Sequence, residues 1–263
     1  MRAFIITAAA VVVTAAAAVP LIAVDAVHGE TAPVVAAAPD KAAIETIVRE
    51  YLIANPEVLQ EAYAALEAKQ QAETEAKQAS AVKDQRDLIY NSTRQVVLGN
   101  PDGKVTMVEF FDYNCGYCKR ALGDTLKLMK ENPDLRVVLK EFPVLGQGSS
   151  EAAQVAVAVN AVAPERYLDF HTALLSSNGQ HDRVAALAAA RELGLPMDKI
   201  QTAMESPAVA ETIEEVYGLA TSLGINGTPS YVVDDKVLVG AVGFDALKER
   251  VAAARDCVGT ETC

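Results

Sequence analysis

The stretch that most constrains the fold is residues 105–120, which read VTMVEFFDYNCGYCKR. An apolar and aromatic run over 105–111 ends at Asp-Tyr-Asn. Two cysteines, Cys115 and Cys118, then open a segment with helical spacing that continues over 119–130. This pattern predicts a buried strand that leads directly into a helix whose first turn carries Cys-x-x-Cys.

The start of a helix is a favourable place for a sulfur nucleophile. Its first backbone N–H groups have no intrahelical acceptor, and the helix macrodipole favours negative charge there. Because only the thiolate attacks a disulfide, a helix start that lowers a cysteine pKa to ~3.5–7.5 makes the thiol reactive at neutral pH. We therefore expect Cys115 to be the nucleophile and Cys118, one turn later, to be the cysteine that closes back onto it.

The composition argues against one large class of partners. The chain carries 23 Lys and Arg against 35 Asp and Glu, and this formal net charge of −12 repels nucleic-acid phosphates. It has no Trp on which bases could stack. With 263 residues and 51% hydrophobic content, it has material for one sizeable core plus appended segments. Nucleic acid is not an expected partner.

The amino-terminal segment has the pattern of an export signal. Arg2 precedes an almost wholly apolar, Ala-rich run over 3–24, and small residues suit cleavage between about 19 and 27. We interpret 1–26 as a signal peptide. An uncleaved anchor is the alternative, since such a run is close to the ~20 residues that span a bilayer. In both cases the rest of the chain lies outside the cytosol, beginning with a disordered spacer at 27–39.

Two amphipathic segments follow within 40–66. Apolar residues repeat every three or four positions before Asn55-Pro56 and again after it, so each segment is expected to be a short helix. Over 67–87, Val82 is the only large apolar side chain, which predicts a solvated helical linker, placed at 67–92. The apolar faces before it are then expected to pack on copies of themselves. A fold back onto the main domain is the alternative.

Further elements follow the Cys-x-x-Cys helix. Residues 135–142 predict a second strand, parallel to the first through a right-handed crossover. Residues 149–223 contain only helical stretches, which predicts a helical subdomain inserted between strands. Two short strands at 230–233 and 236–239 form a hairpin, and a helix over 244–255 closes the domain.

This order resembles the α/β thioredoxin fold of the DsbA-like thiol–disulfide oxidoreductases over residues 94–255, and we place that domain at 93–256. Beyond the cysteines, its most specific mark is Gly-Thr-Pro-Ser at 227–230, which is similar to the family's loop with a cis-proline beside the active disulfide. The resemblance implies catalytic roles for the two cysteines. It also implies substrate binding at Thr228 and Pro229, where an extended client chain would pair with the backbone.

The dipeptide between the cysteines, Gly116-Tyr117, replaces the Pro-His of the strongly oxidising members. It resembles the Cys-Gly-Tyr-Cys of periplasmic disulfide isomerases, and we include Gly116 and Tyr117 among the substrate-binding residues. Without an imidazole N–H near the sulfur, the pKa of Cys115 should fall less.

The segment 40–66 resembles the oligomerising arm of the suppressor of copper sensitivity C proteins, which are trimeric, DsbA-like isomerases. This resemblance implies a periplasmic homotrimer that shuffles wrongly paired disulfides in misfolded exported proteins. It also implies a membrane partner that keeps the cysteines reduced.

Three further residues lie in apolar surroundings. Glu109 is the ionisable residue of the first strand, and it matches the family's buried acidic residue. Burial would raise its pKa and let it exchange the proton of Cys118, whereas a carboxylate on a solvated edge is the alternative. Lys140 either pairs with Glu109 or snorkels to the surface. His171, on an apolar helix face, is expected to be structural.

The remaining cysteines, Cys257 and Cys263, are expected to form an accessory disulfide in the tail at 257–263. Structural zinc is not favoured, because the two cysteine pairs differ in spacing. No resident cofactor is expected, but soft thiolates select Cu(I), which Cys115 and Cys118 would hold. The alternative functions are therefore a copper-binding or chaperone module, a DsbA-like dithiol oxidase, and a glutathione-dependent enzyme on a related fold.

Overall fold

The computed structural model describes residues 40–256. The chain divides into two compact units, Met1–Val58 and Leu59–Cys263. Three expected features lie outside the described residues: the signal peptide at 1–26, the spacer at 27–39 and the Cys257–Cys263 disulfide.

Helix α1 (Lys41–Ala54) is the main described element of the first unit. Its apolar positions repeat at helical spacing, yet none of its side chains is buried. The large exposed apolar side chains are Ile44, Ile47, Val48, Tyr51 and Ile53. Within the described part of its own unit, this apolar face has no partner.

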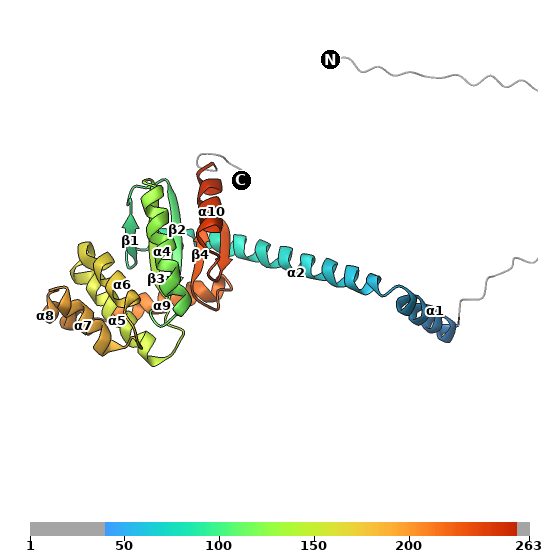
Figure 1. The fold of residues 1–263 in the computed structure, drawn as a ribbon, viewed down its shortest axis with the longest axis horizontal. Coiled ribbons are helices and arrows are strands. Elements are labelled where there is room, and N and C mark those ends of the chain that lie inside the picture. Colours follow the sequence, from blue (N-terminus) through green and yellow to red (C-terminus); the bar gives the residue numbers. More distant parts are fainter. Residues whose placement is uncertain (1–39, 257–263) are drawn as a thin grey trace, which may run out of the picture. The chain divides into compact units, whose positions relative to one another are not determined.

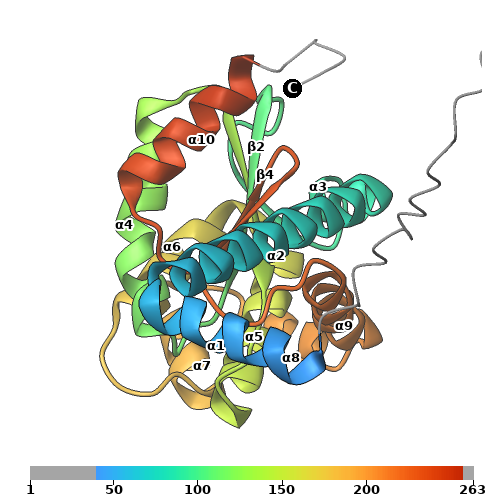
Figure 2. The ribbon, with the colours of Figure 1, turned by 90° about the vertical axis from the view of Figure 1, so that its right-hand side faces the viewer.

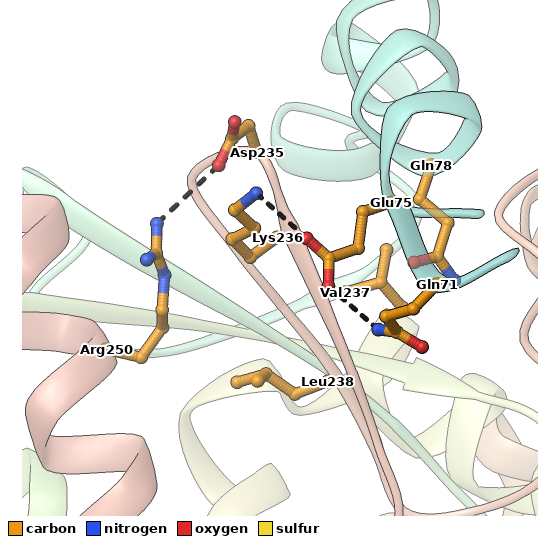
Figure 3. A pocket seen from close by; sticks show the side chains of 8 residues that line it. All are labelled: Gln71, Glu75, Gln78, Asp235, Lys236, Val237, Leu238 and Arg250. Carbon is orange, nitrogen blue, oxygen red and sulfur yellow. Dashed lines mark hydrogen bonds and ion pairs between the residues drawn. The ribbon is translucent and has the colours of Figure 1, made fainter. Parts of the chain in front are cut away.

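Helix α2 (Glu57–Asp84) runs without a break through the second expected arm helix and most of the expected linker. Its last turns are not solvated throughout, because Val82 is buried in one cluster with the short helix α3 (Arg86–Tyr90). Figure 3 shows a groove lined mainly by polar side chains earlier in α2, where Glu75 pairs with Lys236 (3.8 Å). The expectation that the linker has no core to join is therefore wrong for its last turns, since one well-placed apolar side chain docks the helix end.

Five strands form one mixed sheet in the order β1-β3-β2-β4-β5. They are β1 (Val96–Gly99), β2 (Val105–Phe111), β3 (Leu135–Glu141), β4 (Ser230–Val233) and β5 (Lys236–Val239). Strands β2 and β3 are parallel, as predicted, and the other three neighbouring pairs are antiparallel. The sequence pattern does not predict β1, because four residues are too few to establish a period.

Helices cover both faces of this sheet. Figure 2 shows α4 (Gly116–Glu131) and α10 (Phe244–Asp256) on one side of the strands, and α3 and α9 (Pro207–Ser222) on the other. Because side chains alternate along β2, Met107 packs in the core on the α4 side and Val108 in the core on the α9 side. Strand β2 is therefore buried on both faces, as its unbroken apolar run indicates.

Between β3 and β4 the described chain forms helices and one 3-10 turn. They are α5 (Gln147–Val162), η1 (Pro164–Arg166), α6 (Tyr167–Ser176), α7 (Arg183–Glu192), α8 (Met197–Met204) and α9. Figure 1 shows α5 to α8 gathered together, and α6 also contacts α4. The α/β fold with an inserted helical subdomain is confirmed, and the insert reaches the helix that carries the cysteines.

Candidate active site

Hydrogen bonds fix the turn between β2 and α4. Cys115 is the N-cap residue of α4, with φ −81° and ψ 111°. Its N–H donates to the Asp112 carbonyl (3.0 Å), and its carbonyl accepts from the N–H of Lys119 (3.1 Å). The Asp112 carboxylate accepts from the backbone N–H groups of Asn114 (2.8 Å) and Leu145 (2.9 Å). The predicted strand-to-helix junction is confirmed, and Cys115 lies where the free N–H groups of the helix begin.

The two sulfurs differ in exposure and acidity. Cys118 is fully buried, whereas Cys115 keeps 7% of its surface exposed. A hydrogen bond from the Cys118 thiol, helped by Thr228 and by backbone N–H groups at the helix start, lowers the pKa of Cys115 to about 5 despite the opposing effect of burial. Burial, followed by the hydrogen bond to Cys115, raises the pKa of Cys118. The pair therefore combines a thiolate that keeps a small exposed surface with a fully buried thiol.

The loop before β4 lies against Cys115, as predicted. In the protonated form, the Cys115 thiol donates to the Thr228 carbonyl, with 3.2 Å between sulfur and oxygen. The Thr228–Pro229 peptide bond is cis, and Pro229 is buried. The Ser230 hydroxyl donates back to the Gly227 carbonyl (2.8 Å), which holds the loop in shape. The structure thus brings Thr228 and Pro229 together with the cysteines.

The dipeptide between the cysteines lies at the surface. Tyr117 is 59% exposed, and the Arg120 guanidinium lies 4.3 Å from the centroid of its ring. A Cβ on Gly116 would have the Arg120 side chain, at 4.0 Å, as its nearest neighbour, so this position is open. Both residues are therefore exposed between the two cysteines.

Glu109 is buried on the face of the sheet that α4 covers. It is 5% exposed and pairs with Leu139 and Tyr231 in the neighbouring strands. The Thr125 hydroxyl of α4 donates to its carboxylate (2.9 Å). Burial raises the pKa of Glu109 to about 7, although the Thr125 hydrogen bond opposes this shift. The solvated-edge alternative is therefore wrong. Among the described residues, no direct hydrogen bond joins Glu109 to Cys118.

Lys140 is neither the partner of Glu109 nor a snorkelling side chain, so both expectations are wrong. Glu109 lies opposite Leu139, and the next residue, Lys140, points to the other face of the sheet because side chains alternate along a strand. There its ammonium is fully buried, donates to the Leu88 carbonyl (2.9 Å) and lies 3.9 Å from Glu215. Burial lowers the pKa of Lys140 to about 8.

His171 is structural, as expected, and belongs to a buried polar network that the sequence does not reveal. Its Nδ1 lies 3.3 Å from the Tyr113 hydroxyl, which lies 3.2 Å from the Tyr167 hydroxyl. The Tyr167 hydroxyl donates to the Glu141 carboxylate (2.7 Å). Burial raises the pKa of Glu141 well above its ordinary value and lowers that of His171 to about 3. In the sequence, the signal for this network is Glu141, a glutamate at the end of an apolar strand.

Together, the fold and the helix-start cysteine pair define a thioredoxin-like protein. Comparison with protein families makes this specific, because residues 106–252 match the DSBA-like thioredoxin domain. The chain belongs to this family. Residues 40–73 match a second family, described as the copper resistance protein ScsC N-terminal domain.

Individual relatives agree with this membership. A thioredoxin-like oxidoreductase from Silicibacter pomeroyi is 43% identical, with 65% of this chain and 98% of that chain covered and a TM-score of 0.62. Proteus mirabilis ScsC in a compact conformation is 30% identical, with 82% and 99% covered and a TM-score of 0.63. Disulfide bond formation protein D of Bacillus subtilis is 26% identical over 167 residues, covering 60% of this chain and 75% of that protein.

Some curated relatives are much longer than this chain. The Na(+)/H(+) antiporter NhaA of Herminiimonas arsenicoxydans is 29% identical over 167 residues, and the match spans 63% of this chain but only 26% of the antiporter. Among residues 40–256, no helix is both long and apolar enough to cross a bilayer. In the same range, no three His, Cys, Asp or Glu side chains gather as a metal site.

Proposed function

We propose that the protein is an exported thiol–disulfide oxidoreductase that acts on protein disulfides, chiefly as an isomerase. One observation carries this proposal: Cys115, at a helix start and 7% exposed, has a lowered pKa, while its partner Cys118 is fully buried with a raised pKa. A pair made for redox exchange needs this division between an attacking and a resolving sulfur. Family membership supports the same class of reaction.

The reaction begins when the Cys115 thiolate attacks one sulfur of a client disulfide. A mixed disulfide forms between Cys115 and the client, and the other client sulfur leaves as a thiolate. If that thiolate, or another client thiol, attacks within the client, a new client disulfide forms and Cys115 is released unchanged. If Cys118 attacks instead, the client leaves reduced and the enzyme becomes oxidised.

The environment of Cys118 favours the first of these outcomes. Attack by Cys118 requires loss of its proton, and burial raises its pKa. The mixed disulfide is therefore expected to persist long enough for the client to rearrange. We assign Glu109, buried beneath α4 with a pKa of about 7, as the group that exchanges the Cys118 proton when resolution does occur.

Client binding is assigned to the surface around Cys115. The Thr228 carbonyl faces its sulfur, which places the backbone before Pro229 within reach of an extended client chain. Tyr117, which is 59% exposed, and the open Gly116 border the same sulfur in sequence. Pairing with the Thr228 backbone would not depend on the client's side chains, which suits an enzyme that accepts many clients.

We further propose a periplasmic homotrimer, with a signal peptide at 1–26 and an assembly arm at 40–66 joined by a linker at 67–92 to the redox domain at 93–256. The ScsC N-terminal match over 40–73 and the exposed apolar face of α1 support the arm. An isomerase must be kept reduced, so a membrane reductant is the expected second partner, besides misfolded exported proteins. The net charge of −12 argues against nucleic acid as a partner.

The test is the refolding of a small secreted protein whose disulfides have been scrambled, in copper-free buffer. Reduced wild-type protein should restore the native pairing catalytically, and Cys115→Ala should not. Cys118→Ala should retain part of the shuffling, because resolution by the enzyme is not required for each rearrangement. If wild type and Cys115→Ala perform alike, the protein is not an isomerase.

The same assay tests two alternatives. If wild type oxidises dithiols quickly but does not shuffle, the dithiol oxidase is correct. The name of the ScsC family supports a copper role, with Cu(I) held by Cys115 and Cys118. Cys115 suits this role as a ready thiolate, whereas the raised pKa of Cys118 disfavours it, because a metal ligand must be deprotonated. Stoichiometric copper binding without shuffling would support that reading.

A further inference from the structure

A groove beside Cys115 is formed where the catalytic helix meets the inserted subdomain. Cys115, Gly116 and Lys119 line one side, and Asn178, Gly179 and His181, from the connection between α6 and α7, line the other. The sequence offered no signal for this groove, because its two walls are more than fifty residues apart and meet only in the folded domain, where α6 packs on α4.

Hydrogen bonds hold the two walls together. The Asn114 side-chain amide donates to the His181 carbonyl (2.8 Å), and its side-chain oxygen accepts from the His181 N–H (2.7 Å). Asn114 also donates to the Ser149 hydroxyl (3.0 Å), which ties the same loop to α5. The groove is therefore a preformed feature of the domain.

Two of the side chains that line the groove, Lys119 and His181, can still donate a hydrogen bond. The exposed Lys119 ammonium donates to the Ser177 carbonyl (2.7 Å) and lies 3.3 Å from the Asn178 side-chain oxygen, and one of its three N–H groups is left over. His181 is 3% exposed, and within the described chain its Nδ1 has no hydrogen-bond partner. Because His181 lines the groove, a ligand bound there could supply the missing partner.

The nearby carboxylates are already occupied. Asp112 accepts two backbone N–H groups of its own loop, and Asp182 caps α7 by accepting from the Ala185 N–H (2.9 Å). Neither Asp lines the groove. In a chain with a net charge of −12, the groove is thus a local site of donors and positive charge at the start of a sixteen-residue helix.

We infer that this groove binds a carboxylate of the thiol substrate, placed next to the cysteine that forms the mixed disulfide with Cys115. The inference rests on the proposed function, because the sulfur of Cys115 itself lines the groove and fixes the substrate cysteine beside it. A carboxylate would accept from Lys119 and from the Nδ1–H tautomer of His181. It has two sources: an acidic residue beside a client cysteine, or a carboxylate of glutathione.

The test compares two peptide disulfides that differ only in Glu or Gln next to the cysteine. The rate at which reduced, full-length mature protein attacks each one is measured, and each is divided by the rate with dithiothreitol to remove intrinsic reactivity. Wild type should prefer the Glu peptide by roughly three- to ten-fold, the size expected of one partly exposed charge-assisted contact. Oxidised glutathione and its neutral ester form a parallel pair for the second source.

Three variants locate the effect. Lys119→Met and His181→Phe should each bring the Glu/Gln ratio close to one, and His181→Phe should fold because the lost Nδ1 has no partner. Lys130→Met makes the same charge change in the exposed last turn of the same helix and should retain the preference. Equal rates for both peptides, or equal loss in Lys130→Met, would overturn the groove assignment alone. No reaction with any disulfide would instead overturn the proposed function.

A preference in only one pair of probes identifies the source. If the Glu peptide is favoured but glutathione and its ester react alike, the groove binds acidic side chains of the client. The reverse result assigns the groove to glutathione. Both preferences together support the shared carboxylate chemistry.

Discussion

Helices α1 and α4 have similar lengths and similar amphipathic patterns, but only α4 buries its apolar face. Helix α1 has 14 residues and buries none of them. Helix α4 has 16 residues and buries Cys118, Ala121, Leu122, Thr125 and Leu128. An apolar stripe therefore predicts a helix but not its partner. The domain supplies the partner of α4, whereas α1 has none in the described part of its own unit.

The energetic scale of this difference is large. Burying an Ile or Leu side chain contributes ~1.5–3 kcal/mol, so the exposed face of α1 leaves several such contributions unused in a single chain. Assembly of several chains through this face would recover them. The comparison thus contrasts the unit that carries the cysteine pair with the unit that we propose brings copies together.

The largest effect is expected from the nucleophile. Cys115→Ala should reduce shuffling by about 1000-fold or more, because Cys118, the other described cysteine, is fully buried with a raised pKa. Sedimentation should show the same assembly as wild type, since Cys115 lies in the second unit. In wild type, alkylation of Cys115 should rise with a midpoint near pH 5, while Cys118 stays unreactive. A midpoint near ~8.5 would contradict the assignment.

The next effect is expected from the arm. A chain that starts at residue 67 should be monomeric, keep its dithiol oxidation and lose shuffling by about 10-fold or more, because the effective concentration of active sites falls. The start at 67 keeps Val82 and the other apolar side chains that dock α2 and α3. A truncation that shuffles as well as the full chain would give the arm another role.

A matched pair of substitutions refines this test. Ile47→Glu, in α1, should dissociate the assembly, whereas Val184→Glu should not, although Val184 is the more exposed at 75% against 65%. Equal dissociation in both would point to a general effect of added charge.

A smaller effect is expected from Glu109. Glu109→Gln should slow resolution of the mixed disulfide by about 10- to 100-fold and remove a pH dependence centred near pH 7. The sign for stability follows from the raised pKa: the folded state keeps the proton that the unfolded state loses near ~4.3, so wild type loses stability as pH rises through this window to about 7. Denaturant titrations of Glu109→Gln should show a flatter pH profile.

Much of the domain could be predicted because its signals are local. The apolar run of β2, the turn, and the cysteines at a helix start are contiguous in sequence, and the resemblance placed the loop at Thr228–Pro229 beside them. The partner of Lys140 could not be predicted from local sequence. It depends on which face of β3 the side chain occupies, and a change of one residue in the register would put it on the other face. The sequence could not place His181 and Lys119 in the same groove, since only the docking of the insert brings them together.

The smallest effect is expected from substitutions at two positions of α2, one exposed and one buried. Helix α2 carries Leu66, which is 50% exposed, and Val82, which is 1% exposed. Val82→Ala should lower the free energy of unfolding of the chain that starts at residue 67 by roughly 1–2 kcal/mol, because two buried carbon groups are lost and a small cavity remains. It should do so at any protein concentration, since this contact lies within one unit.

Leu66→Ala is the matched change in the exposed part of α2. Residue 66 is absent from the chain that starts at residue 67, so this variant is measured in the full mature chain. There it should leave the unfolding of the domain unchanged and weaken only concentration-dependent association. Sedimentation over a dilution series and denaturant titrations at two protein concentrations separate the two effects. If Val82→Ala also acts only through association, α2 does not dock on the domain through Val82. If Leu66→Ala destabilises a monomer, the exposed half of α2 has a partner within its own chain, and the arm need not assemble copies.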